Sequence, residues 1–121
     1  MLPIITKIEN KAAFQTILDN NPGVVIIKFG AEWCGPCKLI DDDVHAFLHK
    51  MPDNIQSYVL DVDDNVEIYG FLRSKKMVKG IPALLAYYQN NTHYIPDEFI
   101  NGTRKEDMRY FFDSCIDHAT T

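Results

Sequence analysis

The pattern of hydrophobic and polar residues predicts a chain that mixes strands with helices. Residues 24–29 are nearly all apolar, which is typical of a central strand covered on both faces. Shorter runs rich in β-branched and aromatic residues predict an edge strand over residues 4–8, two further strands over 55–61 and 83–88, and a last strand around 93–100. The pattern therefore predicts five strands.

Four other segments carry apolar residues at the spacing of a helix. Asn10 can cap the first of these helices, and the Asn-Asn-Pro-Gly sequence at 20–23 ends it. The second helix is expected from about residue 34 to residue 50, while capping-box patterns at 64–67 and 103–106 predict the starts of the third and fourth. The element order is then β-α-β-α-β-α-β-β-α, which belongs to the α/β class.

Length and charge narrow the class of protein further. The chain has 121 residues, of which 46% are hydrophobic, so we expect one domain over residues 1–121. Asp and Glu outnumber Lys and Arg by 17 to 12, and the net charge of -5 argues against binding to nucleic acid. The first residues show no secretion signal, and no apolar run is long enough to span a membrane. We therefore expect a cytoplasmic protein without a membrane partner.

The chemistry is expected at Cys34 and Cys37, which follow the apolar strand and precede a helix. At a helix N-terminus, a thiolate on Cys34 meets unpaired backbone N–H groups and the positive end of the helix dipole, which lowers its pKa. Cysteines three apart on a helix share a face, at a Cα separation of about 5 Å that a disulfide can bridge. Gly35 permits a sharp turn, and Pro36 suits the first helical turn. The pair therefore predicts an attacking thiol and a disulfide that opens and closes.

Two other interpretations of the cysteine pair have to be weighed. A zinc site needs further ligands, for which the sequence offers His45 and His49 four residues apart but no second cysteine pair. A purely structural disulfide closes too small a loop to restrain the unfolded chain much. The third cysteine, Cys115, falls on the apolar face of the last helix, so we interpret it as a buried, inert thiol, with a regulatory role as the alternative.

The sequence around the pair resembles the active-site signature of a known family. Residues 31–38 read Ala-Glu-Trp-Cys-Gly-Pro-Cys-Lys, and this stretch resembles the active site of the thioredoxin family. The expected element order also matches that family, including its extra N-terminal strand and helix, so the resemblance covers essentially the whole chain. It implies a thioredoxin fold, in which four helices flank a central mixed five-stranded sheet.

The resemblance also implies a reaction and its partners. Cys34 would attack a disulfide of a protein substrate and Cys37 would resolve the mixed disulfide, with no cofactor beyond their own redox-active disulfide. The Gly-Pro dipeptide between the cysteines resembles the reductants of the family, so the expected function is reduction of protein disulfides. The electron donor would be a flavin-dependent thioredoxin reductase, and the chain itself is expected to be a monomer.

Residues outside the pair resemble the substrate-binding surface of the family. Pro82 resembles the cis proline that faces the cysteines, with Gly80 and Ile81 before it, and Ile81 is placed to pair with an extended substrate strand. Gly102 matches the glycine that borders this surface. Trp33 is expected to shield the sulfur atoms and to form part of the same surface.

The clearest departure from the family is Lys28, six residues before Cys34, where the family usually has a buried aspartate that handles the proton of the resolving cysteine. Val59 stands in the place of the lysine that accompanies this aspartate. A buried Lys28 must reach solvent, find a carboxylate partner or lose its proton, and each outcome tunes the pKa of the thiols differently. Gly30 replaces an aromatic residue, and the acidic run at 41–43 is expected to be a solvated face.

Two other functions fit the same residues. The chain could be a redox-inactive module that keeps the fold for protein recognition, or a disulfide oxidant or isomerase that resembles the domains of protein disulfide isomerase. The intact cysteine pair disfavours the first function. The Gly-Pro dipeptide and the missing secretion signal disfavour the second, which Lys28 would favour.

Overall fold

The computed structural model describes all 121 residues and contains four helices and four strands. In chain order these are α1 (Lys11–Asp19), β1 (Val24–Gly30), α2 (Gly35–Leu48), β2 (Ile55–Asp61), α3 (Val66–Ser74), β3 (Ala83–Tyr88), β4 (Glu98–Asn101) and α4 (Lys105–Ala119). None of the helices is long and apolar enough to cross a lipid bilayer. The alternation of helices and strands confirms the α/β class.

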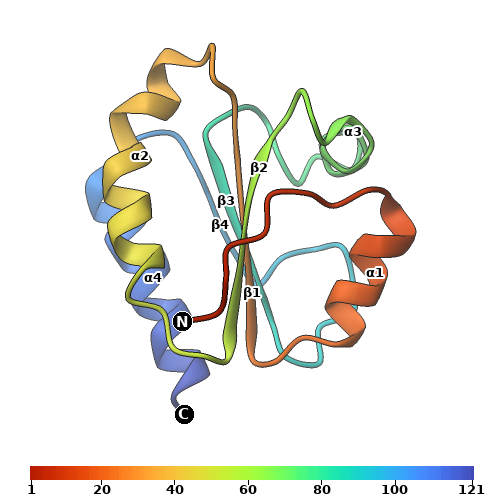
Figure 1. Ribbon diagram of the computed structural model, residues 1–121, viewed down its shortest axis with the longest axis vertical. Helices are drawn as coiled ribbons and strands as arrows, with labels where there is room; N and C mark the ends of the chain where they lie inside the picture. The colour runs from red at the N-terminus through yellow and green to blue at the C-terminus, as the bar shows by residue number, and fades with distance from the viewer.

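The four strands form one mixed sheet in the order β2-β1-β3-β4. β1 pairs in parallel with β2 and antiparallel with β3, and β4 adds to β3 in the antiparallel direction. In Figure 1, α1 and α3 cover one face of this sheet, and α2 and α4 cover the other. β1 is therefore a central strand with helices on both faces, as its nearly continuous apolar sequence predicted.

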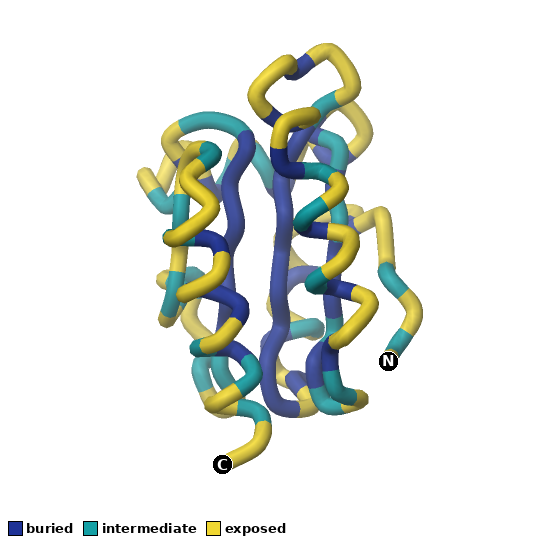
Figure 2. Tube along the Cα trace, turned by 90° about the vertical axis from the view of Figure 1, so that its left-hand side faces the viewer, coloured by how far each residue is buried: buried dark blue, intermediate teal, exposed yellow.

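Side chains of β1 alternate between two hydrophobic cores. The odd-numbered residues from 25 to 29 pack with α1 and α3, whereas Val24 and Ile26 pack with α2 and α4. Figure 2 shows the buried strands running between helices whose outer faces are exposed. Lys28 continues the second series, so its side chain points from β1 toward α2.

The expected edge strand over residues 4–8 is wrong, and the sheet has four strands instead of five. Only Ile5 pairs with β2, where its N–H and its carbonyl both form backbone hydrogen bonds on either side of Tyr58. Farther along, the N–H of Ile8 donates to the side chain of Asn65 at 2.8 Å and not to a strand. The segment therefore leaves the sheet edge after a single bridge.

The last strand is shorter than expected, because β4 covers only Glu98–Asn101 and not residues 93–100. A loop replaces the first half of the expected strand. Asp97 in this loop accepts a hydrogen bond on Oδ2 from the backbone N–H of Tyr88 at 2.7 Å. Pro96 has no N–H to donate, so a ladder of backbone hydrogen bonds cannot continue through it.

Neither of the expected capping boxes forms. α3 has Asn65 as its N-cap, and the carboxylate of Glu67 accepts a hydrogen bond from the N–H of Lys11 in α1 at 2.9 Å. Thr103 lies one residue before the N-cap of α4, which has no side-chain cap. α2 begins and ends slightly inside its expected range. Glu67 therefore contacts a neighbouring helix and does not cap its own.

Asn65 joins three parts of the chain from a buried position. Its side chain accepts a hydrogen bond from Ile8 N at 2.8 Å and donates to the carbonyls of Asp61 and Thr6 at 3.0 and 3.3 Å.

We predict that Asn65→Ala lowers the free energy of unfolding by about 2 to 3 kcal/mol, because it leaves buried backbone groups without partners. Urea denaturation measures the loss, and the exposed Asn101→Ala, expected to change stability by less than about 0.5 kcal/mol, is the control. Equal losses in the two variants would contradict this role.

Candidate active site

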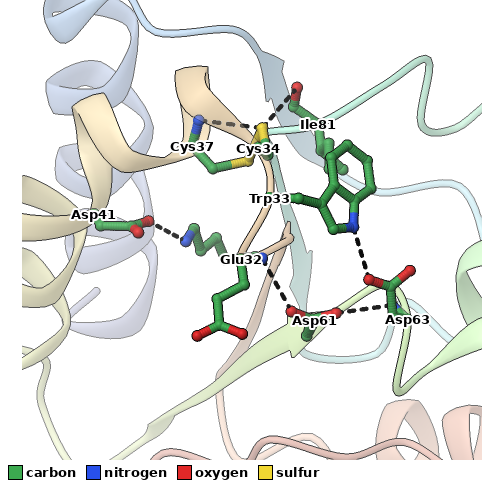
Figure 3. The surroundings of a disulfide bond; sticks show 9 residues. Glu32, Trp33, Cys34, Cys37, Asp41, Asp61, Asp63 and Ile81 are labelled. Atoms are coloured by element: carbon green, nitrogen blue, oxygen red, sulfur yellow. Dashed lines mark hydrogen bonds and ion pairs between the residues drawn. A yellow bond between two sulfur atoms is a disulfide. The ribbon is translucent and has the colours of Figure 1, made fainter.

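Cys34 and Cys37 form a disulfide where the chain passes from β1 into α2 (Figure 3). Their Cα atoms are 5.3 Å apart. Cys34 is the N-cap of α2, and its Sγ accepts a hydrogen bond from Cys37 N at 3.2 Å. Pro36 occupies the first turn of the helix, where a missing N–H removes no helical hydrogen bond. The sulfur of Cys34 therefore lies against the positive end of the helix dipole.

A loop with a cis proline lies opposite the disulfide. The Ile81–Pro82 peptide bond is cis, as the resemblance implied, and the carbonyl oxygen of Ile81 lies 3.9 Å from Cys34 Sγ. The N–H of Gly102 donates to Pro82 O at 3.1 Å, which places Gly102 beside the same loop. The φ of Gly102 is 106°, a conformation that residues with a side chain rarely adopt. Gly80 precedes Ile81 in this loop and is half-buried.

Trp33 lies beside the disulfide and is 68% exposed, so it forms part of the surface around the site. Its indole N–H donates to a carboxylate oxygen of Asp63 at 2.7 Å. Asp61 in turn accepts hydrogen bonds from the backbone N–H groups of Asp63 at 2.8 Å and Glu32 at 3.3 Å (Figure 3). These hydrogen bonds fasten the segment before the cysteines to the end of β2.

Sequence reasoning missed Asp61 and Asp63 as residues of the site. A signal for them exists, because they stand at the carboxyl end of β2, which runs parallel to β1. The carboxyl ends of adjacent parallel strands meet at the same edge of a sheet, where open α/β folds place their sites. The polar residues that follow β2 were therefore candidates from the strand order alone.

Lys28 is buried, with 6% of its side chain exposed, and forms an ion pair with Asp41 of α2. The distance between Lys28 Nζ and Asp41 Oδ1 is 2.5 Å, and the side chain of Asp41 is 39% exposed. Of the three outcomes open to a buried lysine here, the structure shows the carboxylate partner. Val59, which lies beside Lys28 in the β1–β2 register, supplies no charge.

The acidic run at 41–43 is only partly a solvated face. Asp42 is exposed, as expected. Asp41 instead points to Lys28, and Asp43 Oδ2 lies 3.5 Å from Lys105 Nζ in α4. Successive residues on a helix point about 100° apart, so three neighbouring aspartates reach three different surroundings.

Cys115 is unpaired and fully buried in α4. Burial, with a smaller contribution from the charge of Glu98, raises the pKa of its thiol to about 12. It is therefore a neutral thiol at physiological pH, in agreement with the interpretation of an inert residue. His45 and His49 lie one turn apart on α2, and no group of three or more His, Cys, Asp or Glu side chains is placed to hold a metal ion.

The geometry defines a class of protein: a disulfide-forming cysteine pair at the N-terminus of a helix, faced by a cis proline, on an α/β scaffold. Comparison with known proteins agrees with this class. Residues 5–114 match the family model described as thioredoxin. The chain belongs to the thioredoxin family.

Individual relatives resemble the chain over shorter segments. Thioredoxin from Oryctolagus cuniculus is 41% identical over 66 residues, which are 54% of this chain and 62% of that protein, less than two thirds of its length. Thioredoxin from Pongo abelii is 33% identical over 87 residues, covering 71% of this chain and 77% of that protein. The solved structure of oxidized mitochondrial thioredoxin 3 from Saccharomyces cerevisiae superposes with a TM-score of 0.70 at 22% identity, covering 91% of this chain and 94% of that one. This likeness shows the thioredoxin fold.

We predict that iodoacetamide modifies Cys34 of the reduced protein at least about tenfold faster than Cys37, because the thiolate of Cys34 is the one at the helix N-terminus. Cys37 is also the less exposed of the two, at 1% against 5%. Cys115 should stay unmodified at neutral pH, since its pKa is about 12. Mass spectrometry of the peptides at successive times gives the order of labelling. Faster labelling of Cys37 would contradict the assignment.

Proposed function

We propose that this chain reduces disulfide bonds in proteins, with Cys34 as the nucleophile and Cys37 as the resolving cysteine. The observation that carries the proposal is the position of Cys34 at the N-cap of α2, where its sulfur accepts a hydrogen bond from the backbone N–H of Cys37. The same contact would stabilise a thiolate in the reduced protein. Membership of the family supports the proposal, since the matched relatives are named thioredoxin.

In the proposed reaction the thiolate of Cys34 attacks one sulfur of the substrate disulfide. A bond forms between Cys34 Sγ and that sulfur, and the other substrate sulfur leaves as a thiolate with the electron pair of the broken bond. Cys37 then loses its proton and attacks Cys34 Sγ, which releases the second substrate sulfur as a thiolate. The substrate gains two electrons, and Cys34 and Cys37 are left as a disulfide across a Cα separation of 5.3 Å.

We assign substrate binding to the surface formed by Trp33 and the loop around the cis proline. Trp33 offers an exposed ring, and the backbone of Ile81 lies close enough to Cys34 to pair with an extended segment that carries the substrate disulfide. Gly80, Pro82 and Gly102 complete this surface in the proposal. Gly102 leaves room for the substrate backbone, because it has no side chain and nothing lies within 4 Å of its missing Cβ.

The oxidised pair has to be reduced again after each turnover, and we propose a flavin-dependent thioredoxin reductase as the electron donor. The exchange chemistry uses only the sulfur atoms of Cys34 and Cys37 and needs no further cofactor. We also propose a reducing compartment, such as the cytoplasm. Buried, unpaired Cys115 supports this, since free cysteines are typical of proteins from such compartments.

One observation favours a second candidate, a disulfide oxidant or isomerase. Lys28 places a buried positive charge where the family usually has a carboxylate. A cation near the cysteine pair stabilises thiolates, which favours the reduced form and makes the disulfide a stronger oxidant. The Gly35-Pro36 dipeptide resembles the reductants of the family instead, and we keep reduction as the proposed function.

The proposal predicts that catalytic amounts of the protein accelerate the reduction of insulin by dithiothreitol, followed as the turbidity of the released chains. Cys34→Ser should abolish the acceleration, because no nucleophile remains. Cys37→Ser should also lose most of the acceleration. When it is reduced, freed of dithiothreitol and mixed with insulin, it should accumulate a mixed disulfide between Cys34 and the substrate, which mass spectrometry under non-reducing conditions detects.

Cys115→Ser is the matched control and should keep the activity of the natural sequence, because Cys115 lies near Tyr88, which pairs with Val24 at the end of β1 opposite to the pair. If the unmodified protein accelerated insulin reduction no more than Cys34→Ser does, the proposal would be contradicted. It would point instead to a module that uses the fold only for protein recognition.

A further inference from the structure

The side chain of Lys28, a residue of β1, extends into the space between β1 and α2, where few directions are open to it. Its neighbours across the sheet, Val59 in β2 and Leu84 in β3, are both apolar. The aliphatic part of the lysine therefore runs between apolar groups, while its ammonium reaches the carboxylate of Asp41 at 2.5 Å. Burying an unpaired charge is strongly unfavourable, so the carboxylate of Asp41 and the solvent in the cleft beside it together stabilise a charged lysine at this position.

The ion pair borders the resolving cysteine. Cys37 and Asp41 are four residues apart on α2, so their side chains lie on the same face of the helix. A side chain at Gly30 would place its Cβ 3.3 Å from Lys28 Nζ and 3.5 Å from Cys37 Sγ. The ammonium and the sulfur therefore flank the same small space, which the glycine leaves free. Lys28, Asp41 and Gly30 form one unit beside Cys37.

A cleft of about 310 Å³ opens beside this unit and is lined by Lys28, Gly30 and Asp41. The cleft gives the ion pair access to solvent. The other titratable groups that face it come from α2, from β2 and from the connecting segments, and they are His45, Asp61, Glu32 and Asp64. Apart from His45 they are carboxylates, so Lys28 is the one lysine or arginine among the lining residues.

We propose that Lys28, held by Asp41, stabilises the thiolate of Cys37 in the resolving step, in place of a buried proton acceptor. This inference rests on the proposed function. The thiol of Cys37 releases its proton to solvent past Gly30, which lines the cleft, and the thiolate attacks Cys34 Sγ. The bond between Cys34 and the substrate sulfur breaks, and its electron pair leaves with that sulfur. The ammonium has no free electron pair and takes no proton, so Lys28 acts as a positioning residue through its charge.

The opposite charges of Lys28 and Asp41 should have opposite effects on the pKa of Cys37. An ammonium beside a thiol lowers the pKa of the thiol, whereas a carboxylate raises it. Asp41 opposes Lys28, because its negative charge lies on the same helix face as Cys37. Removing Lys28 and removing Asp41 should therefore move the pKa of Cys37 in opposite directions. A role in packing alone predicts no such opposition.

Titration of Cys37 in a Cys34→Ser background tests the inference without requiring turnover. The ultraviolet absorbance of the thiolate reports the pKa of Cys37, and the titration of Cys115 is separate because its pKa is about 12. We expect Lys28→Met to raise the pKa of Cys37 by about one unit or more. Lys28→Arg keeps the charge and should restore most of the original value, and Asp41→Asn should lower it.

Lys38→Met is the matched control, because Lys38 is an exposed lysine directly after Cys37 and solvent screens its charge. It should move the pKa of Cys37 by less than about 0.3 units. With Cys34 restored, Lys28→Met should slow the resolving step about three- to fourfold at neutral pH. The thiolate fraction falls about tenfold, and the greater nucleophilicity of a more basic thiolate recovers about threefold of that loss.

An unchanged pKa of Cys37 in Lys28→Met, or a rise in Asp41→Asn, would overturn the inference and leave Lys28 with a packing role. Asp41→Asn alters a partly exposed side chain, so it decides the question by itself if Lys28→Met does not fold. Neither result depends on disulfide reduction, which the insulin assay measures separately.

Discussion

The structure depends on the burial of β1 on both faces. A strand this apolar is stable only when helices cover it from both sides, and the two pairs of helices do so. The strand ends at Gly30, and α2 begins five residues later at Gly35, so the packing of β1 and α2 in one core sets where the helix starts. Cys34 becomes the N-cap as a result. The reactivity proposed for its sulfur therefore follows from the packing of a strand that contains neither cysteine.

The elements that could be predicted from the sequence are those with a strong internal signal. The strands at 24–29 and 83–88 carry nearly continuous apolar runs, and the strand at 55–61 is rich in β-branched and aromatic residues; all three are present close to their expected bounds. The weaker signals failed where side chains or backbone groups have partners elsewhere in the fold. Ile5 makes one bridge and not a strand, and Glu67 contacts α1 and not the start of its own helix. A local pattern cannot show such long-range competition.

The residues of the site also differ in how far they could be predicted from the sequence. The helix N-terminus at Cys34 follows from a short motif, and the cis bond before Pro82 was implied by the resemblance to the thioredoxin family, so both could be expected before the structure was known. The hydrogen bond from Trp33 to Asp63 joins segments 30 residues apart, and only the parallel pairing of β1 and β2 brings them together. Lys28 stood out as a departure from the family, but its partner could not be chosen among three consecutive aspartates. The phase of α2 selects Asp41, because it lies one turn after Cys37.

In the function proposed here, the cysteine pair works as a reductant even though a buried lysine lies beside it. The most direct test is the reduction potential of the Cys34–Cys37 disulfide, measured by equilibration with glutathione at several ratios of its thiol and disulfide forms. A helix N-terminus and a nearby ammonium both favour the reduced state, so we expect a potential between about -270 mV, the thioredoxin value, and about -200 mV. A potential well above -200 mV, toward the roughly -120 mV of strong oxidants, would contradict the reductase and favour an oxidant or isomerase.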